Sequence, residues 1–161
     1  MCSGVELERL REMPFFRDMP REVLIPLARV AVREKLPAGH MLLRQYDRAR
    51  AVHFLVSGSV QILIQVGVDD LLVAVLDAPG DLIGWSAFRP PYRYTASVRC
   101  EGVTEVVTVP AEAFAEMLDL DPGLTYAVLQ KVAATMAGRM QQARDMLGSA
   151  LRQGPIGSRR R

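Results

Sequence analysis

The stretch from Pro79 to Val98 holds the residues best suited to chemistry, because it combines flexible glycines, a short helix start and a nearby cation. Gly80 and Gly84 free the backbone at two points, and Gly84 to Ala87 offers consecutive amides where a short helix begins. The first amides of a helix have no partner within it and attract phosphate. Arg93 follows, and a guanidinium can bind two phosphate oxygens at once. We therefore expect 79–98 to surround an anion.

Each of these residues also has a purely structural interpretation. Gly84 to Ala87 can be a tight turn in a β protein, and Arg93 can be an exposed arginine at the start of a strand. Trp85, the single tryptophan, either stacks on a ligand or packs in the core. A third alternative is that Trp85 or Tyr94 fills the pocket from within. Neutral donors such as tyrosine hold an anion less strongly than arginine, so a site that relies on them binds weakly.

Other kinds of site have little support in the sequence. His40 and His53 invite comparison with metal-dependent cupin enzymes, but they are not a His-x-His pair and no well-spaced third ligand accompanies them. No nucleophile elbow, paired-carboxylate pattern or P-loop is present in the sequence. We expect no metal, no cofactor and no catalytic residue, and we interpret the chain as a non-enzyme.

Length and composition favour one cytoplasmic domain. The 161 residues are 50% hydrophobic, which is enough for a single core. A net charge of +2 offers no strong field for nucleic acid, apart from the arginines at 159–161. No apolar run is long enough for a membrane helix and the first residues lack a signal-peptide pattern. Cys2 and Cys100 are expected to be free thiols in a reducing compartment.

The elements that must hold 79–98 follow from hydrophobic periodicity. Residues 1–31 predict two helices, with Phe15 and Phe16 contributing to a core and Pro26 shortening or kinking the second helix. Residues 32–109 alternate with a period of two between turn signals, which is typical of an all-β roll or sandwich. Ser57-Gly58 and the turn from Gly67 to Asp70 are predicted to close hairpins.

Residues 110–151 predict two helices, a short one after Pro110 and a long one opened by Asp121-Pro122. The long helix measures about 40 Å from Leu124 to Leu151, more than one roll needs as a cap. Its apolar seam predicts a homodimer of paired helices, and the alternative is that the helix folds back on its own roll. Residues 152–161 lack periodicity and predict a tail. The seam consists of Leu129, Val132, Met136, Met140, Ala143 and Leu147.

The segment 79–98 resembles the phosphate-binding cassette of the cyclic nucleotide-binding domain family. That pattern runs Gly-Glu-Leu-Ala, a short spacer and Arg-Ala-Ala-Thr-Val, and GWSAFRPPYRYTASV can be laid on it without a gap. The family's ribose-binding glutamate falls on Trp85. Its phosphate-binding arginine falls on Tyr94, with Arg93 one place early. The two-helix entry also matches, and the corners of the family's β-roll fall at Gly39, Gly58, Gly80 and Gly84.

The resemblance implies a mainly β fold with flanking α-helices, a jelly-roll-like double-stranded β-helix followed by a long helix. It implies a stand-alone sensor for a cyclic nucleotide or related anion, acting in signal transduction on a downstream protein. Direct DNA binding is not expected, because no recognition helix is found after the long helix. The alternative is a ligand-free interaction module whose pocket is filled by Trp85 and Tyr94, and a metal-dependent cupin-like enzyme is a distant third. The expected ligand-binding residues are Gly84, Trp85, Ser86, Ala87, Arg93, Tyr94 and Thr95.

Overall fold

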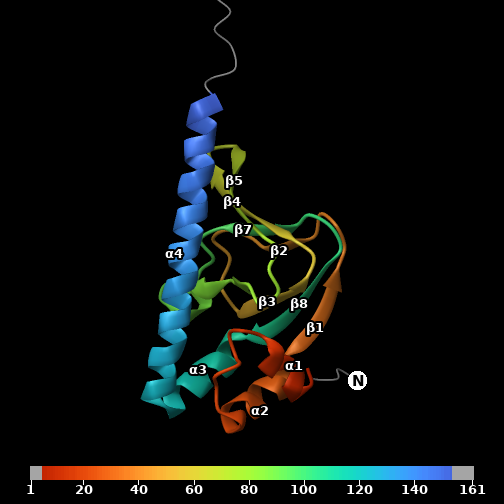
Figure 1. Cartoon of the computed structure of the whole chain (residues 1–161), viewed down its shortest axis with the longest axis vertical. Coiled ribbons are helices and arrows are strands. Elements are labelled where there is room, and N and C mark those ends of the chain that lie inside the picture. Colours follow the sequence, from red (N-terminus) through yellow and green to blue (C-terminus); the bar gives the residue numbers. More distant parts are fainter. Residues whose placement is uncertain (1–4, 154–161) are drawn as a thin grey trace, which may run out of the picture.

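Two four-stranded antiparallel sheets form a β-roll, with short helices gathered at one end and one long helix along its side (Figure 1). The computed structural model describes residues 5–153. One sheet has the strand order β1-β8-β3-β6 and the other β2-β7-β4-β5. The strands are β1 (Val32–Leu36), β2 (Met41–Leu43), β3 (Ala51–Ser57), β4 (Val60–Val66), β5 (Asp69–Leu76), β6 (Leu82–Ile83), β7 (Ser97–Cys100) and β8 (Thr104–Pro110).

Helices lie where the periodicity placed them. They are α1 (Leu7–Glu12), α2 (Arg21–Val30), the 3-10 helix η1 (Trp85–Phe88), α3 (Ala111–Leu120) and α4 (Pro122–Gln153). The prediction of a β region over 32–109, interrupted only at the Gly84 turn, is confirmed. Pro26 lies within α2, which continues for four more residues to Val30. The predicted tail begins later than expected, because α4 runs to Gln153; residues 154–161 lie outside the described part of the chain.

A cluster of buried phenylalanines joins the helices to the roll. Phe15 and Phe16, which follow α1, pack against Phe54 of β3 and Phe114 of α3. The ring centroids of Phe16 and Phe54 are 4.6 Å apart. Aromatic rings bury large apolar areas and tilted pairs are favourable. The Phe15-Phe16 pair therefore contributes to the core, as its sequence position predicted.

The strand connections differ from the prediction at Ser57-Gly58. This turn was predicted to close a hairpin, and that is wrong, because β3 and β4 belong to different sheets. The segment is a corner of the roll, where Gly58 has a φ of +88° and approaches the backbone of Val103 and Thr104. The second hairpin prediction is confirmed, since β4 pairs with β5 from Val60↔Leu76 to Val66↔Asp69. Asp69 and Asp70 open β5 instead of forming its turn.

Helix α4 is capped at its start and anchored near its first third. The Asp121 carboxylate accepts the amide hydrogens of Gly123 at 2.8 Å and Leu124 at 3.3 Å, which satisfies two of the unpaired donors of the first turn. Lys131 donates to the carbonyl oxygen of Phe15 at 2.8 Å and lies above the Phe15 ring. Beyond this anchor the helix passes along β5 and extends past the roll (Figure 1).

The apolar residues of α4 occupy two faces instead of one seam. Val132 is buried with Leu124 and Val128 against the same molecule, so the predicted seam is corrected at this position. Ala143 is half-buried and faces the roll. The outer face is exposed, with side chains between 39% and 73% accessible at Leu129, Met136, Met140, Leu147 and Leu151.

Candidate functional site

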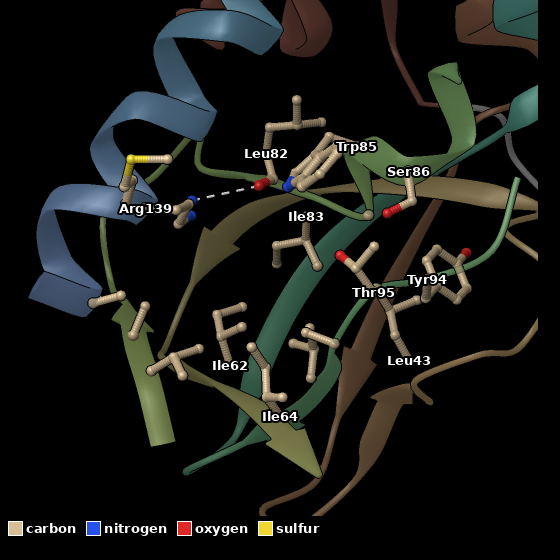
Figure 2. Close-up of a pocket in the computed structure, with 17 residues that line it drawn as sticks. Leu43, Ile62, Ile64, Leu82, Ile83, Trp85, Ser86, Tyr94, Thr95 and Arg139 are labelled. Carbon is tan, nitrogen blue, oxygen red and sulfur yellow. Dashed lines mark hydrogen bonds between the residues drawn. The ribbon is translucent and has the colours of Figure 1, made fainter. Parts of the chain in front are cut away.

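A cavity of about 320 Å³ lies between the inner faces of β4, β5, β6 and β7 and the side of α4 (Figure 2). Most of its wall is aliphatic, and Leu43, Ile62, Ile64 and Ile83 point into it. One end is formed by the segment that the sequence singled out. Of the expected ligand-binding residues in that segment, Gly84, Trp85, Ser86, Tyr94 and Thr95 line the cavity, whereas Ala87 and Arg93 lie outside it.

The Gly84 turn has the shape that its sequence predicted but fewer free amides. Gly84 has a φ of +84°, and a Cβ there would lie 3.2 Å from the Ala51 carbonyl oxygen and from the Tyr94 ring. The helix that follows, η1, has four residues. The Ala87 amide already donates to the Gly84 carbonyl oxygen at 3.1 Å, so it is unavailable to an anion. A turn this short lacks the aligned peptide dipoles of a long helix.

Tyr94 forms part of the wall and its hydroxyl is occupied. The phenol donates to the carbonyl oxygen of Ala51 at 2.8 Å and accepts from the Ala51 amide at 3.3 Å. Burial raises the pKa of this phenol, although the backbone hydrogen bond at Ala51 opposes the shift. With both partners supplied by the backbone of Ala51, the hydroxyl fixes the ring under Gly84. Tyr94 therefore shapes the cavity without filling it.

Arg93 does not line the cavity. Its side chain is exposed and Nη1 donates to the carbonyl oxygen of Tyr46 at 2.8 Å. Its backbone forms an isolated antiparallel bridge with Arg48. Arg93 was expected to pair with a phosphate, but in this structure it is hydrogen-bonded to the loop that contains Tyr46.

The cation that does face the cavity is Arg139 of α4, which sequence reasoning missed. Its Nη2 donates to the Leu82 carbonyl oxygen at 3.4 Å (Figure 2) and lies 3.6 Å from Asp81 Oδ1. Burial lowers the pKa of the guanidinium, and the Asp81 charge opposes that shift. Arginine nevertheless stays protonated in proteins. One signal was available: Arg139 lies seven residues after Val132 and four before Ala143, on the helix face that turns toward the roll.

Neither histidine lines this cavity. His53 is buried in β3, where Nδ1 lies 2.8 Å from Thr108 Oγ1, while His40 is exposed before β2. Among residues 5–153 no three His, Cys, Asp or Glu side chains come together as a metal site would require. Cys100 is a free, buried thiol whose pKa is raised by burial. Cys2 lies outside the described residues.

Comparison with known proteins identifies the class. The sequence profile described as "Cyclic nucleotide-binding domain" matches residues 33–121, more than half of the chain. The chain therefore belongs to the cyclic nucleotide-binding domain family, whose members are typically non-catalytic sensor domains. No helix within residues 5–153 is both long and apolar enough to cross a bilayer.

Individual relatives show the same fold with limited identity. The cAMP-activated global transcriptional regulator CRP of Escherichia coli is 26% identical over 116 residues, which are 71% of this chain and 53% of that regulator. The chain thus spans about half the length of the curated relatives it matches. A candidate cyclic nucleotide-binding protein from Geobacter metallireducens has a TM-score of 0.75 and 26% identity, covering 84% of this chain and 98% of the other. The regulatory subunit of a cAMP-independent protein kinase A from Trypanosoma brucei has a TM-score of 0.69 and 14% identity. The match covers 89% of this chain and 50% of the other.

Proposed function

We propose that this protein is a regulatory sensor domain that binds a cyclic nucleotide or a related anionic small molecule in the cavity of Figure 2. The observation that supports it best is the composition of that cavity: one end is the Gly84–Ser86 turn of the cassette and another side is α4. Ligand pockets are typically apolar clefts of this size or larger with a few polar groups that orient the ligand.

Signal transmission would proceed through α4. Arg139, Met140 and Ala143 line the cavity and belong to the long helix, so a ligand that contacts them differently in two helix positions shifts the population between those positions. The recipient would be a protein partner in the cytoplasm, and the helix would also pair two copies of the chain. The domain would act without catalysis and without direct contact with DNA.

A second candidate function is a ligand-free interaction module. It is favoured by the occupied hydroxyl of Tyr94 and by the position of Arg93 outside the cavity. In the ungapped placement on the cassette, Trp85 and Tyr94 fall at the family's glutamate and arginine positions. A relative with the same fold is described as cAMP-independent, and a triple mutant of it was solved with cAMP in one site. A protein with this fold thus need not depend on cAMP.

Titration separates the two candidates. Cyclic AMP, cyclic GMP and cyclic dinucleotides would each be added to the full chain, with Trp85 fluorescence and melting temperature as readouts. Trp85 lines the cavity and is the single tryptophan, so its emission reports on that site. A sensor should respond with saturation and a raised melting temperature. A flat response to all of them at millimolar concentration would count against the cyclic nucleotide and favour the interaction module.

A further inference from the structure

The wall of the cavity has an unusual balance of charge for a nucleotide site. Within the described part of the chain, Arg139 is the one charged side chain that lines it, and no carboxylate does. The remaining polar side chains are the hydroxyls of Ser86 and Thr95, the occupied phenol of Tyr94 and the indole N–H of Trp85. A ribose would bring hydroxyl donors into a wall with few acceptors, and an unpaired buried donor costs free energy.

Arg139 is held by long contacts that a ligand can replace. Its three nearest partners are the Leu82 carbonyl oxygen at 3.4 Å, Gln142 Oε1 at 3.5 Å and Asp81 Oδ1 at 3.6 Å. Charge-assisted hydrogen bonds are usually near 2.8 Å, and a carboxylate can accept two from one guanidinium. The side chains of Arg139 and Asp81 are 21% and 24% accessible, so their attraction is only partly screened by water. The guanidinium is thus charged and partly desolvated, and its anionic partner Asp81 lies farther away than the usual distance of a charge-assisted hydrogen bond.

We propose that the natural ligand is an organic acid with a single anionic group and an apolar body, and that Arg139 is the residue that binds its charge. This assignment rests on the proposed function of the cavity as a ligand site. The acid group lies against Arg139, and the apolar body lies between Ile62, Ile64 and Ile83. Ser86 and Thr95 line the opposite end and can accommodate a small polar substituent.

Asp81 competes with this ligand for the same cation. Its other carboxylate oxygen accepts the Ala78 amide at 3.2 Å, so the residue also belongs to the turn before β6. When the acid binds, the Arg139–Asp81 pair is exchanged for an Arg139–ligand pair, and α4 loses one tie to that turn. Removing the Asp81 charge should therefore tighten binding of the acid, because Arg139 then has no ion pair to break before it binds the ligand.

Octanoate, 1-octanol and octylamine test the assignment, because they share an apolar chain and differ in charge. Binding to the full chain would be followed by Trp85 fluorescence and by melting temperature. Octanoate should bind more tightly than octanol, and octylamine should bind most weakly. Arg139→Gln keeps a donor for the Leu82 carbonyl and should weaken octanoate binding by about tenfold or more, the scale of a hydrogen bond to a charged group. The same change should leave octanol binding unaltered.

Matched variants make the result specific. Arg144→Gln removes an exposed arginine on the same helix that does not line the cavity, and it should bind octanoate as the wild type does. Arg139→Lys keeps the positive charge and should keep part of the preference for the acid. That result would show that weaker binding by Arg139→Gln does not come from misfolding. Asp81→Asn retains an acceptor for Ala78 and should tighten octanoate binding by about two- to fivefold, the scale of a partly exposed ion pair. That gain should vanish when Arg139→Gln is added.

Equal binding of octanoate and octanol, or unchanged octanoate binding by Arg139→Gln, would overturn the assignment. A further outcome distinguishes it from the broader proposal. If a cyclic nucleotide binds while octanoate does not, the sensor function stands and Arg139 as the organic-acid residue falls. If neither the nucleotides nor the octyl compounds alter Trp85, both fall together.

Discussion

His53 is a buried histidine whose neutral form is part of the folded structure. It is 6% accessible within β3, beside Thr108, whose hydroxyl donates to Glu34 Oε2. Burial lowers the pKa of His53 to about 4, although the nearby Glu34 charge opposes the shift. Because Thr108 gives its proton to Glu34, its oxygen is free to accept from His53 Nδ1. The imidazole is therefore a hydrogen-bonded group of the core.

This histidine should make stability depend on pH. Between its ordinary pKa of 6.5 and about 4, the unfolded chain binds a proton that the folded chain excludes. The free energy of unfolding should therefore fall as pH decreases through this window, by about 3 kcal/mol in total. Urea unfolding of wild type and His53→Asn at pH 7 and pH 4 measures the difference. The variant should lose less stability on acidification.

The exposed His40 provides the control for that experiment. His40→Asn should keep the pH dependence of the wild type. If His53→Asn loses as much stability as the wild type between pH 7 and pH 4, the proton that destabilises the fold binds elsewhere.

An added carbon at Gly58 should be poorly tolerated. A Cβ there would lie 2.6 Å from the Val103 carbonyl oxygen and 2.8 Å from Thr104 Cα, in addition to a φ of +88°. Gly67 has a φ of +65° but nothing within 4 Å of the added carbon. Gly67→Ala should therefore cost about 1 kcal/mol from backbone strain alone, and Gly58→Ala clearly more than about 2 kcal/mol. Denaturant unfolding of both variants measures this, and equal losses would contradict the predicted clash.

At the level of elements, local sequence signals predicted the positions of turns well, but they predicted poorly which strands pair and which surface a helix packs against. Ser57-Gly58 has ordinary turn chemistry, but such a turn serves a hairpin or a corner between sheets equally well, and only long-range pairing of β3 with β6 and β8 decides. On α4, intervals of three and four placed Val132 and Met136 in one seam, while the fold buries the first and exposes the second. Apolar spacing alone cannot say which molecule covers a face.

The same limit explains the candidate site. Gly84, Ser86 and Thr95 were predictable, because glycine conformation and cassette length are local properties of the chain. Arg139 had only the weaker signal of its spacing along α4, because it reaches the cavity from a helix far along the sequence and its role depends on how α4 packs against the roll. Arg93 has the right chemistry at nearly the right position, but its backbone is held in an isolated bridge with Arg48 and its side chain donates to the Tyr46 carbonyl oxygen.

The cassette itself can be tested by restoring the family residues. Trp85→Glu combined with Tyr94→Arg supplies an acceptor for a ribose hydroxyl and a cation for a cyclic phosphate, so it should create or strengthen binding of cyclic AMP. Isothermal titration measures this, since the variant lacks its fluorophore. The single change Tyr94→Phe serves as a control, because it removes the hydroxyl bound to Ala51 without adding charge. No gain in the double variant, once folding is verified by circular dichroism, would mean that the ungapped placement of the cassette is wrong.

For the whole molecule, the exposed face of α4 predicts a homodimer. Leu129, Met136, Met140, Leu147 and Leu151 recur at alternating intervals of seven and four residues and are accessible in the single chain, and Met140 also borders the cavity. Pairing of two such helices about a two-fold axis would bury them. Leu147→Glu should dissociate the dimer, because it places a charge in the seam and leaves the cavity wall intact. Molar mass by light scattering decides: a monomer for the wild type would refute the pairing.

Gln141→Glu adds the same charge at an exposed polar residue of α4, so it is the matched control. It should leave the molar mass unchanged. Dissociation by both substitutions would indicate general repulsion and not loss of a specific seam.

The contacts of Lys131 fix α4 at one point, and the rest of the helix extends beyond it. Lys131 donates a hydrogen bond to the Phe15 carbonyl oxygen and lies over the Phe15 ring. Arg139 lies about two turns further along α4, at the cavity. With a rise of 1.5 Å per residue, Arg139 is about 12 Å from Lys131 and Gln153 about 33 Å. A sideways displacement of the helix at the cavity is therefore multiplied nearly threefold at its far end. A shift too small to disturb the roll would become a movement that a neighbouring protein can detect.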